Sequence, residues 1–137
     1  MIIETRVKNI TLKTRNLNIG YRKKQQENLV ASGIDLELHE GELMAVIGEN
    51  GVGKSTFLRT ISGIQPELSG EVFINDEDRR SLSPQKLAAF ISLVLTEQPL
   101  SKNLSVAELV ALGRQPYTNW LGSLTSEDKK EVKRALE

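Results

Sequence analysis

Residues 48–55 read Gly-Glu-Asn-Gly-Val-Gly-Lys-Ser, and this octapeptide constrains the fold more than any other stretch of the chain. It matches the pattern G-x-x-x-x-G-K-[ST], the P-loop. The continuous apolar run 43–47 precedes it and predicts a strand buried on both faces. A segment with helical apolar spacing follows it and is expected to end near Gly63. Strand, glycine-rich loop and helix form the context that the motif requires, so we interpret it as a nucleotide-binding loop rather than a chance match.

Phosphate binding explains the spacing of this motif. Glycines let the backbone curl so that successive N–H groups point at phosphate oxygens. Lys54 would reach the β- and γ-phosphates as a flexible point charge, and the Ser55 hydroxyl can ligate Mg²⁺. The helix that begins near Gly53 adds the positive end of its dipole. The motif therefore predicts a site for a nucleotide and Mg²⁺.

The remaining pattern predicts an α/β fold. Alternating apolar and polar residues indicate half-exposed antiparallel strands at 11–20, with one slip in phase, and at 29–39, separated by a polar loop, 22–28. We expect further strands at 70–75 and 91–95, the second being continuously apolar and part of a parallel core. Helices are expected after Ser83-Pro84, from the capping box at Ser105 to Gly113, and from a looser box at Thr125 to Glu137.

Composition excludes several classes of protein. The 137 residues carry 18 Lys plus Arg against 18 Asp plus Glu, so no basic surplus favours nucleic-acid binding. The absence of Cys excludes disulfides and thiolate metal sites. No apolar run approaches the length of a membrane span, and the first ten residues lack the apolar core of a secretion signal.

Residues 41–75 read GELMAVIGENGVGKSTFLRTISGIQPELSGEVFIN. This stretch resembles the ATP-binding subunit of an ABC transporter, whose pattern includes Gly-Glu, an apolar strand, G-x-N-G-x-G-K-S-T and a Ser-Gly before the next strand. The resemblance implies a P-loop NTPase of the ABC ATPase type, with an antiparallel β subdomain, part of a parallel-sheet core and the start of a helical subdomain. It implies ATP and Mg²⁺ as cofactors, with Ser55 as a metal ligand. The implied ATP-binding residues are Gly48, Glu49, Asn50, Gly51, Val52, Gly53, Lys54, Ser55 and Thr56.

The same resemblance assigns a role to Tyr21, which follows an alternating strand about 27 residues before Gly48. The family places an aromatic side chain there that stacks on adenine, and a flat ring over a flat base makes a tolerant contact. The alternative is a core tyrosine at the end of a strand.

In the loop after 91–95 the family has a glutamine that contacts Mg²⁺ and the attacking water. Here the loop reads Leu-Thr-Glu-Gln-Pro. Counting from the strand places Glu97 in this position, with Gln98 one residue later. Gln98 is our preferred catalytic and metal-binding residue, and Glu97 is the alternative because its carboxylate could also bind Mg²⁺. A third interpretation is that both are surface residues of a loop.

The run Ala-Leu-Gly-Arg-Gln-Pro-Tyr, 111–117, resembles importers of iron-siderophore, haem and cobalamin. The resemblance implies a homodimer of ATP-binding subunits that binds membrane-spanning permease subunits at the cytoplasmic face of the cell membrane. Arg114, Tyr117 and Trp120 would offer contact chemistry for the permease. The alternative is that Tyr117 and Trp120 only cover a small helical subdomain.

Two other features of the sequence resemble catalytic groups but are better explained by local structure. Residues 72–77 end in Asn-Asp-Glu after an apolar strand, but they follow Lys54 too closely for a catalytic carboxylate, and Asn75-Asp76 suits a hairpin turn. His39 lies on the polar face of a strand, and we expect it to be solvated and without a partner.

Several motifs of the implied family do not occur in this sequence: the Leu-Ser-Gly-Gly signature, the later strand that ends in Asp-Glu (Walker B) and the switch histidine. Residues 1–137 would then be a partial ATP-binding domain whose own hydrolysis is negligible. Two other functions remain as alternatives, a soluble ABC-type ATPase in translation or DNA repair and a non-catalytic remnant. A GTPase is disfavoured because no Asn-Lys-x-Asp base reader is present.

Overall fold

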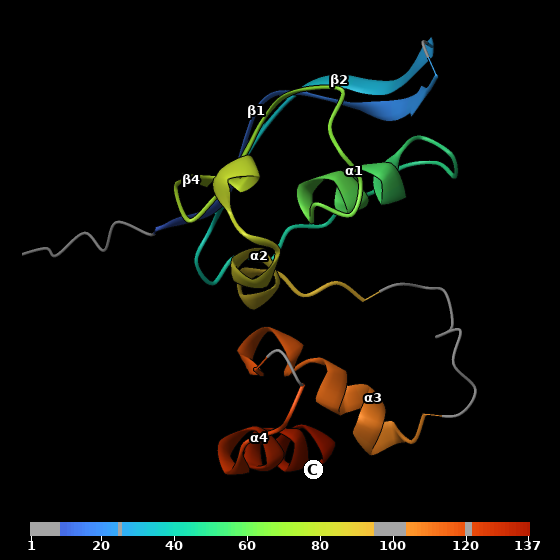
Figure 1. Cartoon of the computed structure of the whole chain (residues 1–137). Coiled ribbons are helices and arrows are strands. Elements are labelled where there is room, and N and C mark those ends of the chain that lie inside the picture. Colours follow the sequence, from blue (N-terminus) through green and yellow to red (C-terminus); the bar gives the residue numbers. More distant parts are fainter. Residues whose placement is uncertain (1–8, 25, 95–103, 120–121) are drawn as a thin grey trace, which may run out of the picture. The chain divides into compact units, whose positions relative to one another are not determined.

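The computed structural model describes residues 9–24, 26–94, 104–119 and 122–137. The chain divides into two compact units, Met1–Leu82 and Ser83–Glu137 (Figure 1). The first unit holds the sheet and the P-loop. The second unit is helical.

The first unit is built on a four-stranded antiparallel sheet with the strand order β2-β1-β3-β4. The strands are β1 (Ile10–Lys23), β2 (Gln26–His39), β3 (Ser69–Ile74) and β4 (Glu77–Asp78). The first two form a long hairpin from Ile10↔His39 to Lys23↔Gln26. The predicted loop 22–28 is therefore wrong in length, because pairing continues almost to the turn at Lys24.

The slip in phase predicted for the first strand is confirmed as irregular register between Thr14 and Gly20. Asn16 has φ 44°, and its backbone N–H donates a 2.6 Å hydrogen bond to Asp35 Oδ1. The side-chain oxygen of Asn18 accepts a 2.8 Å bond from the backbone N–H of Gly33. Side chains thus satisfy backbone donors where the ladder is interrupted, as a bulged strand requires.

Helix α1 (Lys54–Ile61) packs against β1 on one face of this sheet. The core beneath it consists of Leu17, Ile19, Phe57, Val72 and Ile74, all buried. The predicted hairpin turn is confirmed by the left-handed conformations of Asn75 (φ 48°) and Asp76 (φ 64°), which a two-residue type I′ turn needs. The 3₁₀ helix η1 (Arg79–Ser81) follows β4.

The second unit contains α2 (Pro84–Phe90), α3 (Val106–Leu112), the 3₁₀ helix η2 (Gln115–Tyr117) and α4 (Ser126–Leu136). All three predicted helix starts are confirmed. Ser83 caps α2 with Pro84 in its first turn, and Ser105 and Thr125 form capping boxes with Glu108 and Asp128. These caps satisfy N–H groups that a helix start leaves unpaired.

The predicted parallel strands are wrong for the described residues. Neither 43–47 nor 91–94 is paired in a sheet, and Leu95 lies outside the described part of the chain. A strand exists only where a neighbour supplies hydrogen bonds. Leu43 is 98% exposed, Ile47 88% and Val94 95%, so these apolar runs keep the composition of buried strands without the burial.

Candidate nucleotide site

The loop 48–53 leads into α1 through backbone conformations that few residues other than glycine adopt. Gly51 has φ 88° and Gly53, the N-cap of α1, has φ 110°. A Cβ added to Gly53 would lie 2.5 Å from Val30 Cγ1 on β2. Gly53 is therefore required twice, for its left-handed turn and for the close approach to the hairpin.

Lys54 lies across the loop that precedes it. Its ammonium group donates 2.8 Å hydrogen bonds to the carbonyl oxygens of Gly48 and Glu49. The loop thus curls around the lysine and brings a positive charge to its open side. A phosphate placed there would meet a charge-assisted donor.

The start of α1 is left open for an anion. Its N-cap makes no side-chain hydrogen bond, and its first turn carries no acidic residue. The N–H groups at such a helix start favour negative charge through the helix dipole. Ser55 is exposed in this turn, whereas Thr56 is only 6% exposed.

Tyr21 reaches this turn from the end of β1. Its hydroxyl oxygen lies 2.9 Å from Thr56 Oγ1, while the residue as a whole is 47% exposed. The structure thus brings the predicted stacking residue beside the P-loop helix and leaves much of its ring open. It is a strand-end tyrosine, but it is not a core residue.

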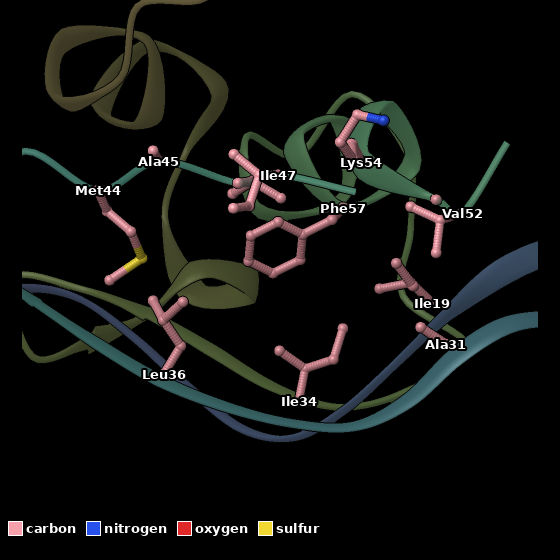
Figure 2. A pocket seen from close by; sticks show the side chains of 12 residues that line it. Ile19, Ala31, Ile34, Leu36, Met44, Ala45, Ile47, Val52, Lys54 and Phe57 are labelled. Atoms are coloured by element: carbon pink, nitrogen blue, oxygen red, sulfur yellow. The ribbon is translucent and has the colours of Figure 1, made fainter. Parts of the chain in front are cut away.

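A cavity of about 390 Å³ lies between the sheet and the segment before the P-loop (Figure 2). The side chains of Ile34, Leu36, Met44 and Phe57 point into it from β2, the 43–47 segment and α1. Lys54 stands at its edge with its amine directed away. Most of the lining is apolar and the Lys54 amine is directed away from it, so the cavity itself is not suited to hold phosphates.

The residues at hand fit ATP better than they fit a preformed metal site. Glycine turns, an open helix start and Lys54 are the donor set that phosphates require. Among the described residues, no group of three or more acidic or histidine side chains could hold a metal ion. Ser55 alone offers one oxygen, which suits Mg²⁺ that arrives with the nucleotide phosphates. Glu97 and Gln98 lie outside the described residues.

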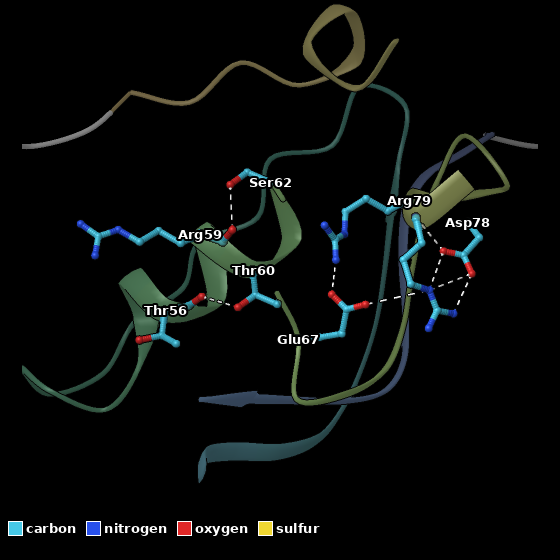
Figure 3. A network of polar contacts seen from close by, with 8 residues as sticks. Thr56, Arg59, Thr60, Ser62, Glu67, Asp78 and Arg79 are labelled. Carbon is cyan, nitrogen blue, oxygen red and sulfur yellow. Dashed lines mark hydrogen bonds and ion pairs between the residues drawn. The ribbon is translucent and has the colours of Figure 1, made fainter. Parts of the chain in front are cut away.

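An ion pair that is largely shielded from solvent and that the sequence did not predict follows α1 in the chain (Figure 3). Glu67, in the loop after the helix, is paired with Arg79 of η1, and both side chains are only 10% exposed. Arg80 approaches the same carboxylate at 4.0 Å and pairs with Asp78 at 2.7 Å. The network ties the loop after α1 to the β4–η1 segment, and no sequence pattern links residues 12 positions apart in this way.

In the second unit, Arg114 has internal partners. Its Nε donates a 2.9 Å hydrogen bond to Asp128 Oδ1, and its guanidinium lies 4.2 Å from the centre of the Tyr117 ring. Tyr117 is 54% exposed, and Trp120 lies outside the described residues. Arg114 therefore links η2 to α4 within the second unit.

The prediction that His39 has no partner is wrong. Its Nδ1 lies 3.2 Å from Glu42 Oε2, and the same carboxylate accepts a 2.9 Å hydrogen bond from the His39 backbone N–H. The pair fixes the turn after β2 and lies on the surface, so it stabilises local structure only modestly.

Comparison with known proteins places the chain in a family. The ABC transporter family model matches residues 31–137, so the chain belongs to the ABC transporter family. Its fold is that of an ABC ATPase, a P-loop NTPase. No helix in the described part of the chain combines the length and the apolar character needed to cross a membrane.

Two curated relatives illustrate the similarity. An uncharacterised ABC transporter ATP-binding protein of Methanocaldococcus jannaschii, MJ0873, is 42% identical over 121 residues, 88% of this chain and 40% of that protein. The iron(3+)-hydroxamate import ATP-binding protein FhuC of Bacillus subtilis is 32% identical over 127 residues, 93% of this chain and 46% of that protein. The chain thus spans less than half the length of these relatives.

A solved structure shares the fold. The dimeric bacterial ABC transporter cassette MJ0796 matches with a TM-score of 0.72 and 26% identity, over 91% of this chain and 54% of that chain. The same cassette has been solved in a post-hydrolysis state bound to ADP and Pi, with a TM-score of 0.72 and 25% identity over 91% of this chain and 55% of that chain.

Proposed function

We propose that this chain is the nucleotide-binding part of an ATP-binding subunit that drives import of a metal chelate, such as an iron-siderophore, haem or cobalamin, through a membrane permease. The observation that carries the proposal is the curled loop 48–53, with Lys54 across it and an open helix start behind it. This geometry supports binding of a triphosphate.

In the proposed site the loop residues enclose the phosphates. The backbone N–H groups of Gly51, Gly53 and the first residues of α1 would donate to phosphate oxygens, and Lys54 would exchange its carbonyl partners for the β- and γ-phosphates. Ser55 would ligate Mg²⁺, which neutralises phosphate charge and lowers the cost of phosphoryl transfer. Thr56 would contribute its backbone N–H, from the third position of the same turn.

The remaining residues of the site come from outside the loop. Tyr21 would stack on adenine, and its half-exposed ring beside α1 supports this role. Gln98, or Glu97 in its place, would contact Mg²⁺ and orient the attacking water. We also propose that residues 1–137 are a partial ATP-binding domain, in keeping with the coverage of the relatives. The chain would then bind ATP weakly and turn it over negligibly.

The proposed partners follow from the family. A second ATP-binding subunit would complete the site, as the dimeric state of the MJ0796 cassette suggests by analogy. Permease subunits would bind the pair at the cytoplasmic face of the membrane. The chelate cargo is supported by the similarity to FhuC and by the 111–117 run.

Uptake by living cells tests the function. Cells that express the intact subunit of which residues 1–137 are the proposed part, native or with Lys54→Ala, would be supplied with radiolabelled ferric hydroxamate, haem or cobalamin. The proposal predicts that at least one of these three chelates enters native cells about tenfold faster or more than Lys54→Ala cells. If native and Lys54→Ala cells take up each of the three chelates at the same rate, the proposed cargo is wrong. Unaltered growth of the variant cells on other nutrients is the control for general damage.

A further inference from the structure

We propose that Thr56 is a positioning residue for the nucleobase: its hydroxyl holds the phenol of Tyr21, so that the ring is fixed as a stacking platform before a nucleotide arrives. This inference rests on the proposed function. It concerns a contact between two side chains that are far apart in the sequence and meet only in the fold.

The geometry separates the two ends of Tyr21. Its hydroxyl oxygen lies 2.9 Å from Thr56 Oγ1, and Thr56 is only 6% exposed. The residue as a whole is 47% exposed. The polar tip is therefore tethered at a buried partner, while the body of the side chain stays open to a ligand.

Thr56 is a firm anchor for this tether. Its carbonyl oxygen accepts a 2.8 Å hydrogen bond from the hydroxyl of Thr60, which is fully buried one turn further along α1. Thr56 thus lies on the buried face of the helix, where close packing restricts its side chain.

A second tether joins the neighbouring residue of β1 to the same helix region. Gln65 Nε2, in the loop after α1, donates a 2.5 Å hydrogen bond to the carbonyl oxygen of Gly20. A Cβ at Gly20 would lie 2.1 Å from the Asn28 carbonyl oxygen, so this stretch of β1 also packs tightly against β2. Gly20 is thus hydrogen-bonded to the loop after α1, and the next residue, Tyr21, is hydrogen-bonded to the first turn of α1.

Fixing the ring in advance reduces the side-chain entropy that base binding would otherwise remove. Stacking alone would let Phe replace Tyr21 without loss, because the ring is retained. If Thr56 positions the ring, Tyr21→Phe instead weakens ATP binding by about threefold to tenfold, the equivalent of one immobilised side chain. Binding of tripolyphosphate, which has no base, should not change.

The experiment measures affinity of the full chain for Mg-ATP and for inorganic tripolyphosphate in five variants. They are Tyr21→Phe, Thr56→Val, the double variant, Thr56→Ser and Tyr117→Phe. Thr56→Ser retains the hydroxyl, and Tyr117→Phe makes the same chemical change in the second unit. Since the chain has only two tyrosines, ¹³C labelling in the Tyr117→Phe background reports the Tyr21 ring alone without any ligand.

The proposal expects Tyr21→Phe, Thr56→Val and their combination to weaken ATP equally, because all three remove one contact. Tripolyphosphate affinity, Thr56→Ser and Tyr117→Phe should stay near native values, and Thr56→Val should shift the Tyr21 ring signal. ATP affinity unchanged by Tyr21→Phe, additive losses, or equal losses for both ligands would each overturn the positioning role while leaving the P-loop assignment intact. If the native chain binds neither ligand, the proposed function fails and the positioning role fails with it.

Discussion

The ammonium nitrogen of Lys54 lies 2.8 Å from the carbonyl oxygen of Gly48, the residue that opens the loop, six positions earlier in the chain. A second bond of the same length reaches the next carbonyl, that of Glu49. The lysine thus bridges the loop from the first residue of α1. Because carbonyl oxygens are weaker partners for a cation than phosphate oxygens, these bonds hold the charge in place and can be exchanged for a ligand.

Lys54→Ala should reduce the affinity for Mg-ATP at least tenfold, equivalent to about 1.4 kcal/mol or more. The loss combines the missing charge with a loop that no longer has its internal bridge. Isothermal calorimetry on the full chain measures it. Lys130→Ala, the same change on the exposed side of α4, should bind as the native chain does. Equal affinities of Lys54→Ala and Lys130→Ala would exclude Lys54 as the main phosphate contact.

Ser55→Ala should reduce the dependence of ATP binding on Mg²⁺. The hydroxyl is the one metal ligand that we assign within the P-loop, and losing a contact to a charged partner costs about 1.5–3 kcal/mol. Affinity for ATP in Mg²⁺ should therefore fall by about tenfold or more, and affinity in EDTA should not change. A loss of the same size in both buffers would mean that Ser55 acts on the loop rather than on the metal.

Breaking the Glu67–Arg79 pair should destabilise the first unit strongly. Both side chains are 10% exposed, and Arg79 Nε is already buried without a hydrogen-bond partner in the structure. Glu67→Gln removes the negative charge that compensates the Arg79 guanidinium and should lower the free energy of unfolding by about 3 kcal/mol. Glu67→Leu with Arg79→Met removes both charges and should cost much less.

Urea denaturation followed by circular dichroism measures these differences. Glu27→Gln is the matched control, since Glu27 and Arg22 form a pair that is about half exposed and should contribute less than about 1 kcal/mol. The account of the buried pair is wrong if the double variant is the least stable of the set.

Asp128 should make the second unit sensitive to acid. Hydrogen bonds from the Thr125 hydroxyl and backbone N–H, followed by one from Arg114, hold the pKa of Asp128 below its ordinary value. A lowered folded-state pKa stabilises the fold above the unfolded pKa of about 3.9, and this stabilisation disappears as the pH falls through the folded pKa.

The stability difference between the native chain and Asp128→Asn should therefore be constant near neutral pH and shrink below about pH 4. Thermal unfolding monitored from pH 7 to pH 2 gives this difference, with Glu127→Gln, an exposed neighbour, as the control. A difference that persists unchanged at pH 2 would show that the carboxylate charge does not stabilise α4.

Local chemistry made part of this fold predictable. Ser83-Pro84 and the two capping boxes identified helix starts because a cap satisfies its own N–H groups within four residues. Asn75-Asp76 identified a turn for the same local reason. The strand predicted at 43–47 is wrong because a strand needs neighbouring strands, which composition cannot supply. In the described part of the chain, no strand is paired with this segment.

The candidate site divides in the same way. Gly53, Lys54 and Ser55 could be assigned from a motif whose spacing is itself the chemistry. The contact between Tyr21 and Thr56, the Glu67–Arg79 pair and the attachment of Arg114 to Asp128 depend on tertiary packing. No periodicity or local spacing encodes them, so they appeared only with the fold.

The central claim is that loop 48–55 binds a nucleoside triphosphate, and a calorimetric titration of the native chain with Mg-ATP tests it most directly. We predict weak but saturable binding of about one ATP per chain, displaced by tripolyphosphate because the phosphates supply most of the contacts. Heat that never saturates, or binding that tripolyphosphate in large excess leaves untouched, would contradict the assignment of this loop as a phosphate-binding site.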